Sequence, residues 1–500
     1  MKIAISYPPL ESKKGVACLS QNRQFQWLSR PTYIYPVIPA YAASLLKESG
    51  YGVLWDDAIA EEISYEEWKR RIIREKPDII AIETKTPVVK RHWKIIDELK
   101  EESYKVDKVC KVHKEEVWNP KIVLMGDHVT ALPEESLDNS KVDYVIASGD
   151  YDFMLLNLAN YLLKGEALEG GFWFRDKSGR VTSSGRSDLS KHDLNTLPLI
   201  NRELTRWKSY AYKNGNFKHK PGAYMMSARD CWWGKCSFCS WTTMFPGNSF
   251  RTMSAEKALD EVGNLIKLGA KEIMEDSGTL PIGKWLKEFC EGMIREGYDK
   301  KIKISCNMRI NAIKNPATWK LMKRAGFRMI LFGLESANQE TLDKINKNLK
   351  VSEIEPGLRR CRDARLEPHI TAMAGYPWET EEMAQRTVNL AKKLFKQGLI
   401  DTLQGTIVIP YPGTPLYKYC EENNLLLTKK YEDYDQRQAV MKSPLSSGKA
   451  LEFVRGLYKS FASPQFVWRK IKSIKSPGDV KFLFVSGWKW LGKMADFGKH

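Results

Sequence analysis

Two series of short apolar segments, each alternating with amphipathic stretches, run through most of this 500-residue chain. The first series lies in residues 1–164, where helical stretches end at Gly50 and before Pro77. Its strand-like segments are KIAISYP, YGVLWDD, DIIAIET, KIVLMGDH and VDYVIASGD. Strands and helices that alternate at this spacing form right-handed βαβ units on a parallel sheet. We therefore expect an N-terminal α/β domain with a doubly wound parallel sheet of the Rossmann or flavodoxin type.

The second series, in residues 223–425, contains six strand candidates separated by helical stretches. They are AYMMSARD, KEIMED, KIKISCNMR, RMILFGLES, HITAMAGY and DTLQGTIVIPY. Six βα units predict a partial (β/α)6 barrel of the TIM type, with the active site at the carboxyl ends of the strands. Residues 165–222, between the two series, are polar and rich in turn residues, which indicates a linker. Within it, GGFWFRDKSGRVTSS predicts a hairpin that turns at Ser178 and Gly179.

Residues 426–500 differ in charge from the rest of the chain and predict a helical basic region. The whole chain has a net charge of +18, which favours an anionic partner such as nucleic acid, a membrane surface or a phosphorylated substrate. Ten Lys or Arg and two Asp fall in the last 46 residues. Aromatic residues are interleaved with them: Phe461, Phe466, Trp468, Phe482, Phe484, Trp488 and Trp490. This region is either a helical cap on the barrel or an element that docks on a lipid or a substrate.

Several sequence features bear on where the protein works. No apolar run approaches the roughly 18 to 20 residues that cross a bilayer. The N-terminal segment MKIAISYPPL lacks the apolar core of a signal peptide. The chain has nine cysteines, and this odd number argues against a disulfide framework. We expect a cytoplasmic protein, placed at the inner face of the membrane if the basic tail docks there.

Three of the cysteines, Cys231, Cys236 and Cys239, form a C-x4-C-x2-C pattern directly after the first barrel strand. Three thiolates on one loop can bind three irons of a [4Fe–4S] cluster and leave the fourth iron open. The alternative is a structural zinc site, which needs four protein ligands. His219 could supply the fourth zinc ligand, but no second Cys pair follows nearby, and the pattern therefore favours the cluster.

The segment ARDCWWGKCSFCSW resembles the signature of the radical S-adenosylmethionine (SAM) superfamily, usually C-x3-C-x2-C with an aromatic residue before the last cysteine. Phe238 occupies the aromatic position, and the longer first spacing resembles the CWWGxC loops of a cobalamin-binding subset. The resemblance implies that Cys231, Cys236 and Cys239 ligate a [4Fe–4S] cluster. It also implies that SAM chelates the open iron through its amino and carboxylate groups. Reductive cleavage of SAM would then give methionine and a 5′-deoxyadenosyl radical.

The later barrel strands extend this resemblance through the segments IMEDSGTLP, ISCNMRINAI, MILFGLESANQETLDKINK, MAGYPWETEE and IPYPGTPLY. The first of them departs from the common GGE tripeptide. The SAM contacts implied by the resemblance are Phe238, Glu275, Asp276, Ser277, Arg309, Glu335, Ser336, Gly375 and Glu379. Acids and hydroxyls at strand ends suit the amine and ribose of SAM, and glycines allow adenine to approach the backbone.

The first domain resembles the cobalamin-binding domain that often precedes this barrel. MGDHV stands where relatives have GGxH, and SGDYD stands where they have GEGE. The implied cobalamin contacts are Pro8, Thr84, Lys85, Gly126, Asp127, His128, Ser148 and Gly149. None of the seven histidines has an Asp two residues before it, so the sequence excludes a D-x-H-x-x-G histidine on the lower face of cobalt. The alternative is a degenerate flavodoxin-like domain kept only for packing.

The resemblance as a whole implies a cobalamin-dependent radical SAM enzyme that functionalises an unactivated carbon, with methyl transfer as the leading reaction. Similar enzymes such as the anaerobic magnesium-protoporphyrin ester cyclase do not methylate, so cyclisation, carbon–carbon bond formation or rearrangement, including of a lipid, is an alternative. An RNA- or protein-modifying radical SAM enzyme is another, although no RNA-binding module is recognisable and nucleic acid is not expected. The full barrel disfavours a non-enzymatic regulator. Expected partners are a small-molecule or lipid-like substrate and an electron donor such as flavodoxin or ferredoxin.

Overall fold

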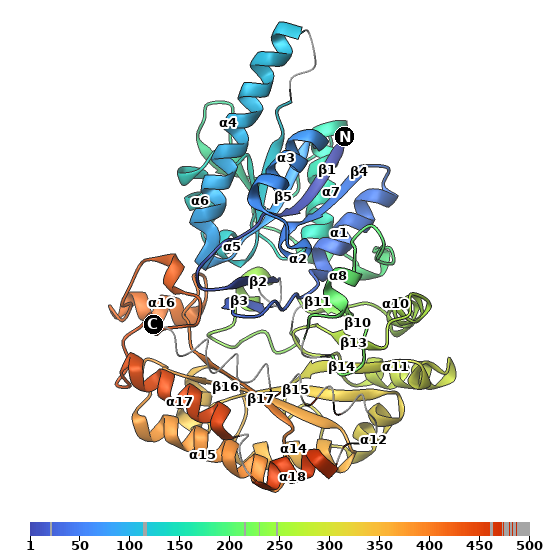
Figure 1. Ribbon diagram of the computed structural model, residues 1–500, viewed down its shortest axis with the longest axis vertical. Coiled ribbons are helices and arrows are strands. Elements are labelled where there is room, and N and C mark those ends of the chain that lie inside the picture. Colours follow the sequence, from blue (N-terminus) through green and yellow to red (C-terminus); the bar gives the residue numbers. More distant parts are fainter. Residues whose placement is uncertain are drawn as a thin grey trace. The chain divides into compact units, whose positions relative to one another are not determined.

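The chain divides into two compact units, which we describe separately (Figure 1). The first comprises Met1–Trp27, Tyr33–Tyr210 and Thr243–Ser249, and the second comprises Leu28–Thr32, Ala211–Thr242 and Phe250–His500. The computed structural model describes residues 1–20, 23–113, 118–214, 217–229, 231–246, 249–460, 464–472, 474, 480, 483 and 487. The tail aromatics that lie outside the described residues are Phe461, Phe482, Phe484, Trp488 and Trp490.

A seven-stranded sheet forms the core of the first unit, in the order β4-β1-β5-β6-β7-β8-β9. The strands are β1 Lys2–Tyr7, β4 Gly52–Asp57, β5 Ile79–Glu83, β6 Lys121–Met125, β7 Tyr144–Ile146, β8 Phe172–Arg175 and β9 Val181–Ser183. The sheet is parallel from β4 to β7, and β8 and β9 add an antiparallel edge. The parallel part has the flavodoxin order, which places the switch point between β1 and β5. The predicted doubly wound sheet is therefore confirmed.

In the described part of the chain, eight helices belong to the first unit. They are α1 Val37–Glu48, α2 Ala58–Glu61, α3 Tyr65–Glu75, α4 Val89–His113, α5 Asp127–Ala131, α6 Pro133–Asn139, α7 Tyr151–Lys164 and α8 Lys208–Ala211. The Ser64 hydroxyl accepts a hydrogen bond from the Glu67 amide at the start of α3. Helix α7 ends at Gly165, whose φ of 70° is left-handed. A separate two-stranded sheet consists of β2 Val16–Ser20 and β3 Arg23–Leu28.

The hairpin that the sequence predicts at Ser178 and Gly179 joins β8 to β9. The Asp176 carboxylate accepts a hydrogen bond from the Ser178 amide at 2.8 Å, and Gly179 has a φ of 82°. The sequence places this hairpin in a linker, whereas in the structure its strands extend the sheet of the first unit. Short apolar strands were recognisable, but nothing in the spacing indicates which sheet an edge hairpin joins.

The second unit is a half-barrel whose six strands are all parallel, in the order β10-β13-β14-β15-β16-β17. The strands are β10 Gly222–Met225, β13 Glu272–Glu275, β14 Lys303–Met308, β15 Phe327–Glu335, β16 Glu367–Ala374 and β17 Thr402–Ile407. Each arises from one of the six predicted segments, so the predicted partial barrel is confirmed. A short antiparallel pair, β11 Ala228–Arg229 and β12 Arg251–Thr252, follows β10.

Figure 1 shows seven of the described helices on the outer side of the half-barrel: α10 Ala255–Lys267, α11 Lys284–Arg295, α12 Pro316–Arg324, α14 Val351–Asp363, α15 Glu381–Gln397, α17 Ser447–Lys459 and α18 Pro464–Lys472. Three shorter helices among the described residues are α9 Trp241–Met244, whose last two residues belong to the first unit, α13 Gln339–Lys344 and α16 Pro415–Glu422. Helix α18 packs on the end of α15, where the rings of Phe466 and Phe395 lie 5.2 Å apart. Within the described part of the chain, we find no helix with the length and apolar character that crossing a bilayer requires.

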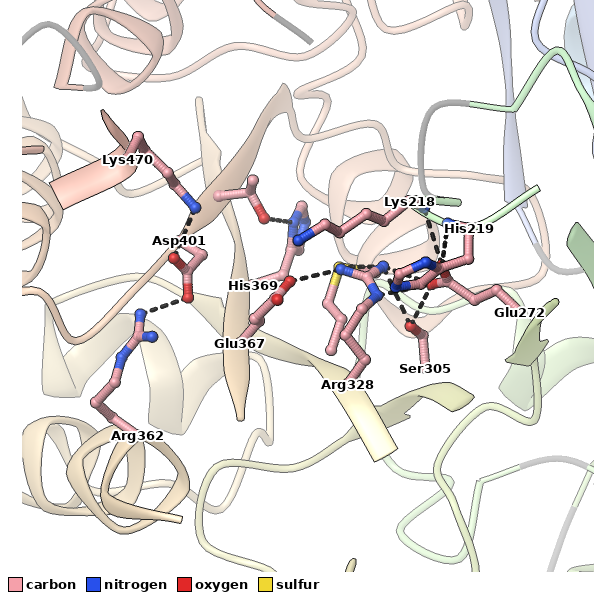
Figure 2. Close-up of polar contacts among 12 residues, drawn as sticks. Lys218, His219, Glu272, Ser305, Arg328, Arg362, Glu367, His369, Asp401 and Lys470 are labelled. Carbon is pink, nitrogen blue, oxygen red and sulfur yellow. Dashed lines mark hydrogen bonds and ion pairs between the residues drawn. The ribbon is translucent and has the colours of Figure 1, made fainter. Parts of the chain in front are cut away.

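A buried ion network lies at the amino ends of the barrel strands (Figure 2). The Arg328 guanidinium donates to Glu272 at 2.9 Å and to Glu367 at 2.6 Å. The second oxygen of Glu272 accepts from the backbone amides of Lys218 and His219, at 2.9 Å each. The network therefore holds the segment before β10 against strands β13, β15 and β16.

Candidate functional site

The three-cysteine loop runs from the end of β11 to the start of α9, at the carboxyl end of the barrel strands. The Ser237 amide donates to the Ile345 carbonyl at 3.0 Å, and the Leu416 amide donates to the Ser237 carbonyl at 2.8 Å. Ile345 follows α13 and Leu416 lies in α16, so main-chain bonds hold the loop to segments that follow β15 and β17. The Cys239 amide closes a turn on the Cys236 carbonyl at 3.2 Å.

The three thiols lie close enough to influence one another electrostatically. Burial raises the pKa of both the Cys236 and Cys239 thiols, and the charge of Lys347 opposes this effect at each of them. The Cys231 sulfur lies 3.1 Å from the hydroxyl oxygen of Thr279. Iron would have to displace the thiol protons, and the nearby cation favours the resulting thiolates.

The zinc alternative requires His219 beside the cysteines, and the structure separates them. His219 lies before β10, where its amide donates to Glu272 at the amino end of β13. The cysteines follow the other end of β10. In the described part of the chain, no three His, Cys, Asp or Glu side chains converge on one point as the ligands of a single ion do. Thiolates of a [4Fe–4S] cluster each bind a different iron and need not converge in this way.

A buried ion pair between Glu335 and Lys347 lies next to the cysteine loop. The Lys347 ammonium is 2.8 Å from one oxygen of Glu335 and 5.9 Å from the centre of the Phe238 ring. The other oxygen of Glu335 accepts a hydrogen bond from the Thr371 hydroxyl at 3.2 Å. Burial alone would lower the pKa of Lys347, but the charges of Glu335 and Cys236 outweigh it and the pKa lies above its ordinary value.

The backbone around this pair leaves no spare space. A Cβ on Gly333 would lie 2.3 Å from the Glu335 carboxylate and 2.5 Å from the Lys347 ammonium. Glu335 itself has a φ of 66°, a left-handed conformation that a residue with a side chain rarely adopts. Such a conformation is costly, and the bonds to Lys347 and Thr371 hold the Glu335 carboxylate in place.

Arg309, at the end of β14, lies over both tryptophans of the cysteine loop. Its guanidinium is 5.6 Å from the ring centre of Trp232 and 4.8 Å from that of Trp233. It donates hydrogen bonds to the carbonyls of Lys347 and Asn348. Burial lowers the pKa of Arg309, while Cys236 and Cys231 act in the opposite direction. Arg309 and Lys347 therefore bring two cations to the loop.

The predicted acidic group at the end of β13 has two different environments. One oxygen of Glu275 accepts from the Ser227 amide and hydroxyl, at 2.8 Å each, and from the Ser277 hydroxyl. The Ser277 oxygen accepts from the Ala228 amide at 3.0 Å, so this serine fixes the approach to the cysteine loop. The Asp276 carboxylate lies 3.4 Å from the Asn307 amide nitrogen. Among the described residues, the second oxygen of Glu275 is buried without a partner.

Strand β16 ends in a turn that buries two more polar atoms without partners. Glu379 accepts a hydrogen bond from the Gly375 amide at 2.6 Å, and Gly375 has a φ of 96°. Within the described structure, neither the other oxygen of Glu379 nor the Tyr376 hydroxyl has a hydrogen-bond partner. Burial raises the pKa of Glu379 to about 7. Unpaired buried polar atoms are costly, and three of them at one barrel end fit a site that a polar ligand completes.

Ser336, like Ser277, is a predicted SAM contact whose hydroxyl is used locally. Its hydroxyl accepts from the Asn338 amide and side chain, at 3.2 and 3.1 Å. Sequence reasoning did not single out Thr279, Gly333, Lys347 or Tyr376. Two asparagines flank Lys347, with left-handed φ values of 51° and 48°, and an Asn-x-Asn between helices is the turn signal that was available.

The carboxyl edge of the first unit carries a second polar cluster. The Lys85 ammonium lies 3.5 Å from Glu83 and 3.7 Å from Asp127, and the Tyr7 hydroxyl donates to Glu83 at 2.7 Å. Tyr151, which begins α7, has a buried hydroxyl without a partner among the described residues. Burial raises the pKa of Tyr151, and Glu83 and Asp127 raise it further, so its hydroxyl keeps its proton. A free donor at this edge fits a polar ligand.

Other predicted cobalamin contacts shape this edge rather than expose ligating atoms. The two ring nitrogens of His128 lie 3.2 Å from the Thr86 hydroxyl and 3.1 Å from Glu135. Thr84 bonds His92 at 2.7 Å, and Pro8 and Ser148 are buried. Both ring nitrogens of His128 are therefore engaged by side chains of the first unit.

Two glycines at this edge allow close backbone approaches. Gly126 has a φ of 131°, and a Cβ there would lie 2.1 Å from the Thr84 carbonyl oxygen. A Cβ on Gly149 would lie 2.4 Å from the ring of Phe245, whose segment Thr243–Ser249 packs in the first unit. The Gly149 amide also donates to the Met244 carbonyl at 3.0 Å. The structure thus shows that Gly149 accommodates an aromatic side chain, which the sequence did not reveal.

Comparison with known proteins supports the family resemblance that the sequence shows. Residues 225–391 match the family model described as the Radical SAM superfamily. An uncharacterized methyltransferase, PH0819 of Pyrococcus horikoshii, is 28% identical over 469 residues, 92% of each protein. The anaerobic magnesium-protoporphyrin IX monomethyl ester cyclase of Cereibacter sphaeroides is 26% identical, over 85% of this chain and 66% of its own length.

Among solved structures, the fold is similar to that of TsrM from Kitasatospora setae, a radical S-adenosylmethionine methyltransferase with cobalamin and a [4Fe–4S] cluster bound. The TM-score is 0.68 with 12% sequence identity, and the match covers 99% of both chains. A match at this identity establishes the fold of both units together with the order in which they occur. The expected fold class is therefore confirmed, and the match of residues 225–391 to the Radical SAM superfamily model agrees with the family that the sequence resembles.

Proposed function

We propose that this protein is a cobalamin-dependent radical SAM enzyme that functionalises an unactivated carbon, most simply by methyl transfer. The carrying observation is the cysteine loop at the carboxyl end of a half-barrel, faced by buried polar atoms without partners. When bound, the cluster and SAM would supply a 5′-deoxyadenosyl radical and cobalamin a methyl group. An external one-electron donor of the flavodoxin or ferredoxin class would reduce the cluster.

The chain's own residues would hold these groups. Cys231, Cys236 and Cys239 would each bind one iron. One oxygen of Glu275, one oxygen of Glu379 and the Tyr376 hydroxyl would bind polar groups of SAM. Their lack of hydrogen-bond partners in the described structure supports this role.

Cobalamin would bind at the carboxyl edge of the first unit, near the switch point between β1 and β5. The free Tyr151 hydroxyl and the close approaches at Gly126 support this assignment. Because the nitrogens of His128 are engaged, we expect no protein histidine on cobalt. The EPR spectrum of the Co(II) form should then lack nitrogen superhyperfine splitting from a lower ligand.

Methylation is favoured over cyclisation because PH0819, a named methyltransferase, matches over nearly its full length. The cyclase similarity keeps ring closure as the second candidate. Both readings imply a small-molecule or lipid-like substrate. The exposed Trp468 and Ile471 on the basic helix α18 support contact with an anionic membrane at the cytoplasmic face, which sedimentation with anionic liposomes would test.

The deciding experiment is anaerobic reconstitution of the full chain with iron, sulfide and hydroxocobalamin. We expect one [4Fe–4S] cluster, bound cobalamin in the visible spectrum, and 5′-deoxyadenosine when SAM and a reductant are added. Cys231→Ala, Cys236→Ala and Cys239→Ala should each abolish 5′-deoxyadenosine formation. Cys420→Ala, a buried cysteine outside the loop, is the matched control and should retain it. Full activity in the loop variants would remove the proposal.

A further inference from the structure

The segment that follows α13 is hydrogen-bonded to the cysteine loop and to the segment that follows β14. The carbonyls of Ile345, Asn346 and Asn348 accept hydrogen bonds from the Ser237 amide, the Trp233 indole and the Asn311 side chain, at 3.0, 2.8 and 2.9 Å. Arg309 donates hydrogen bonds to the carbonyls of Lys347 and Asn348, which belong to the same turn. The turn is therefore fixed relative to the thiols, and so is the lysine in its middle.

Lys347 projects from this turn toward the cysteine loop and not toward solvent. Its side chain is 10% exposed, and its ammonium contacts Glu335 at 2.8 Å. Glu335 is held in turn by Thr371 and by the absence of a side chain at Gly333. A lysine has several rotatable bonds, and a buried carboxylate that is itself fixed removes that freedom.

The charges fixed beside the cysteine loop do not cancel. The Lys347 ammonium lies 5.9 Å from the ring centre of Phe238, which stands between Cys236 and Cys239 in the loop. Arg309 is a second cation beside the same loop, 5.6 and 4.8 Å from the ring centres of Trp232 and Trp233. Glu335 is the one carboxylate of this group, paired with Lys347 at 2.8 Å and bound by Thr371 through its other oxygen. Two cations and one carboxylate leave a net positive charge at the loop, in a buried environment where charges are poorly screened.

We propose that Lys347, positioned by Glu335, raises the reduction potential of the [4Fe–4S] cluster that the proposed function assigns to the cysteine loop. Reduction adds one electron, and therefore one negative charge, to the cluster from the external donor. A fixed cation beside the loop stabilises the reduced form more than the oxidised form, and nearby charge is one determinant of such potentials. Lys347 would act on the cluster only through its charge and would supply no atom to the reaction.

The test is an EPR-monitored redox titration of the reconstituted full chain. Lys347→Met should shift the midpoint potential of the cluster to more negative values, whereas Lys347→Arg should keep it close to that of the unmodified protein. Glu335→Gln should shift it in the opposite direction, because the cation then acts without its counter-charge. Lys344→Met removes a more exposed lysine of the neighbouring helix α13, which contacts Glu340 at 2.7 Å and the Trp378 ring at 5.0 Å, and should leave the potential unchanged.

The outcomes separate this proposal from the proposed function on which it rests. Failure of the unmodified chain to incorporate iron would overturn the proposed function. With iron bound, an unchanged potential in Lys347→Met would overturn the role of Lys347. Shifts of the same sign in Lys347→Met and Glu335→Gln would show that both changes merely disturb the loop, and would overturn it as well. If Lys347→Met does not fold, the sign of the Glu335→Gln shift decides.

Discussion

The half-barrel has a charged cluster at each end, and the two clusters differ in whether their polar atoms are paired. At the amino end, Glu272 is fully buried and accepts bonds from Arg328, Ser305 and two backbone amides (Figure 2). At the carboxyl end, Glu275 and Glu379 each keep one buried oxygen without a partner in the described structure. Buried glutamates are thus fully paired at the amino end and partly unpaired at the carboxyl end.

The difference follows from what each end must do. A network whose donors and acceptors all meet stabilises the arrangement of strands, and removing one partner leaves a buried charge alone. A network with unpaired buried donors or acceptors lowers stability until a ligand pairs with them, and binding sites have such unpaired groups. In barrels of this type the amino end is the end associated with stability and the carboxyl end the one associated with chemistry. The following predictions test that division.

The largest effect is expected at the closed end. Arg328→Met leaves Glu272 buried without its cation and should lower the free energy of unfolding by about 3–5 kcal/mol in denaturant titrations. Arg359→Met removes an exposed arginine paired with Glu355 along a helix and should cost less than about 1 kcal/mol. Equal losses in both variants would contradict the view that the Arg328 network is a structural element.

At the open end, stability should depend on pH through Glu379. Burial raises the pKa of Glu379 from 4.5 to about 7, so the folded chain holds this proton more tightly than the unfolded chain. The free energy of unfolding should therefore be highest below pH 4.5 with respect to this group and fall, by on the order of 3 kcal/mol, as pH rises to about 7. Glu379→Gln should remove this slope from pH-dependent unfolding curves; a persistent slope would assign it to another group.

Tyrosines with an unpaired and with a paired hydroxyl should also differ in how they respond to loss of that group. Tyr376→Phe removes an unpaired hydroxyl and should leave stability unchanged while weakening SAM binding by about 1 kcal/mol, measured by calorimetry. Tyr458 is the matched control, because its hydroxyl is paired with the Gly405 amide and carbonyl at 3.2 and 3.0 Å. Tyr458→Phe should lower stability and leave SAM affinity as it was. The reverse pattern would refute the comparison.

The smallest effect is expected at the partly exposed margin of the closed end. Lys470 of α18 pairs with Asp401 at 2.7 Å, with side chains 25% and 17% exposed. Asp401 also pairs with Arg362, so Lys470→Met leaves the carboxylate a partner. We expect a loss of roughly 0.5 kcal/mol in the free energy of unfolding. A loss as large as that of Arg328→Met would mean that α18 is part of the structural network.

The sequence was sufficient for the fold because alternation of strands and helices is a local signal that each barrel segment carries by itself. It also located the cysteines and most strand-end residues, since a motif such as GYPWET fixes Glu379 relative to Gly375. It could not assign Lys347 to Glu335, because their contact depends on how a turn after α13 returns to the strand. It also could not show that Ser277 and Ser336 use their hydroxyls locally, because bonding partners are set by tertiary contacts.

The main-chain anchoring of the cysteine loop has a consequence for how such proteins diverge. The bonds at Ser237 use only amide and carbonyl groups, which nearly every amino acid supplies at any position. Side chains at Ile345 and Leu416 can therefore drift over generations without releasing the loop. A lineage is free to reshape the surroundings of its thiols for a new substrate while the loop keeps its form, so sequence identity can fall far while the architecture persists.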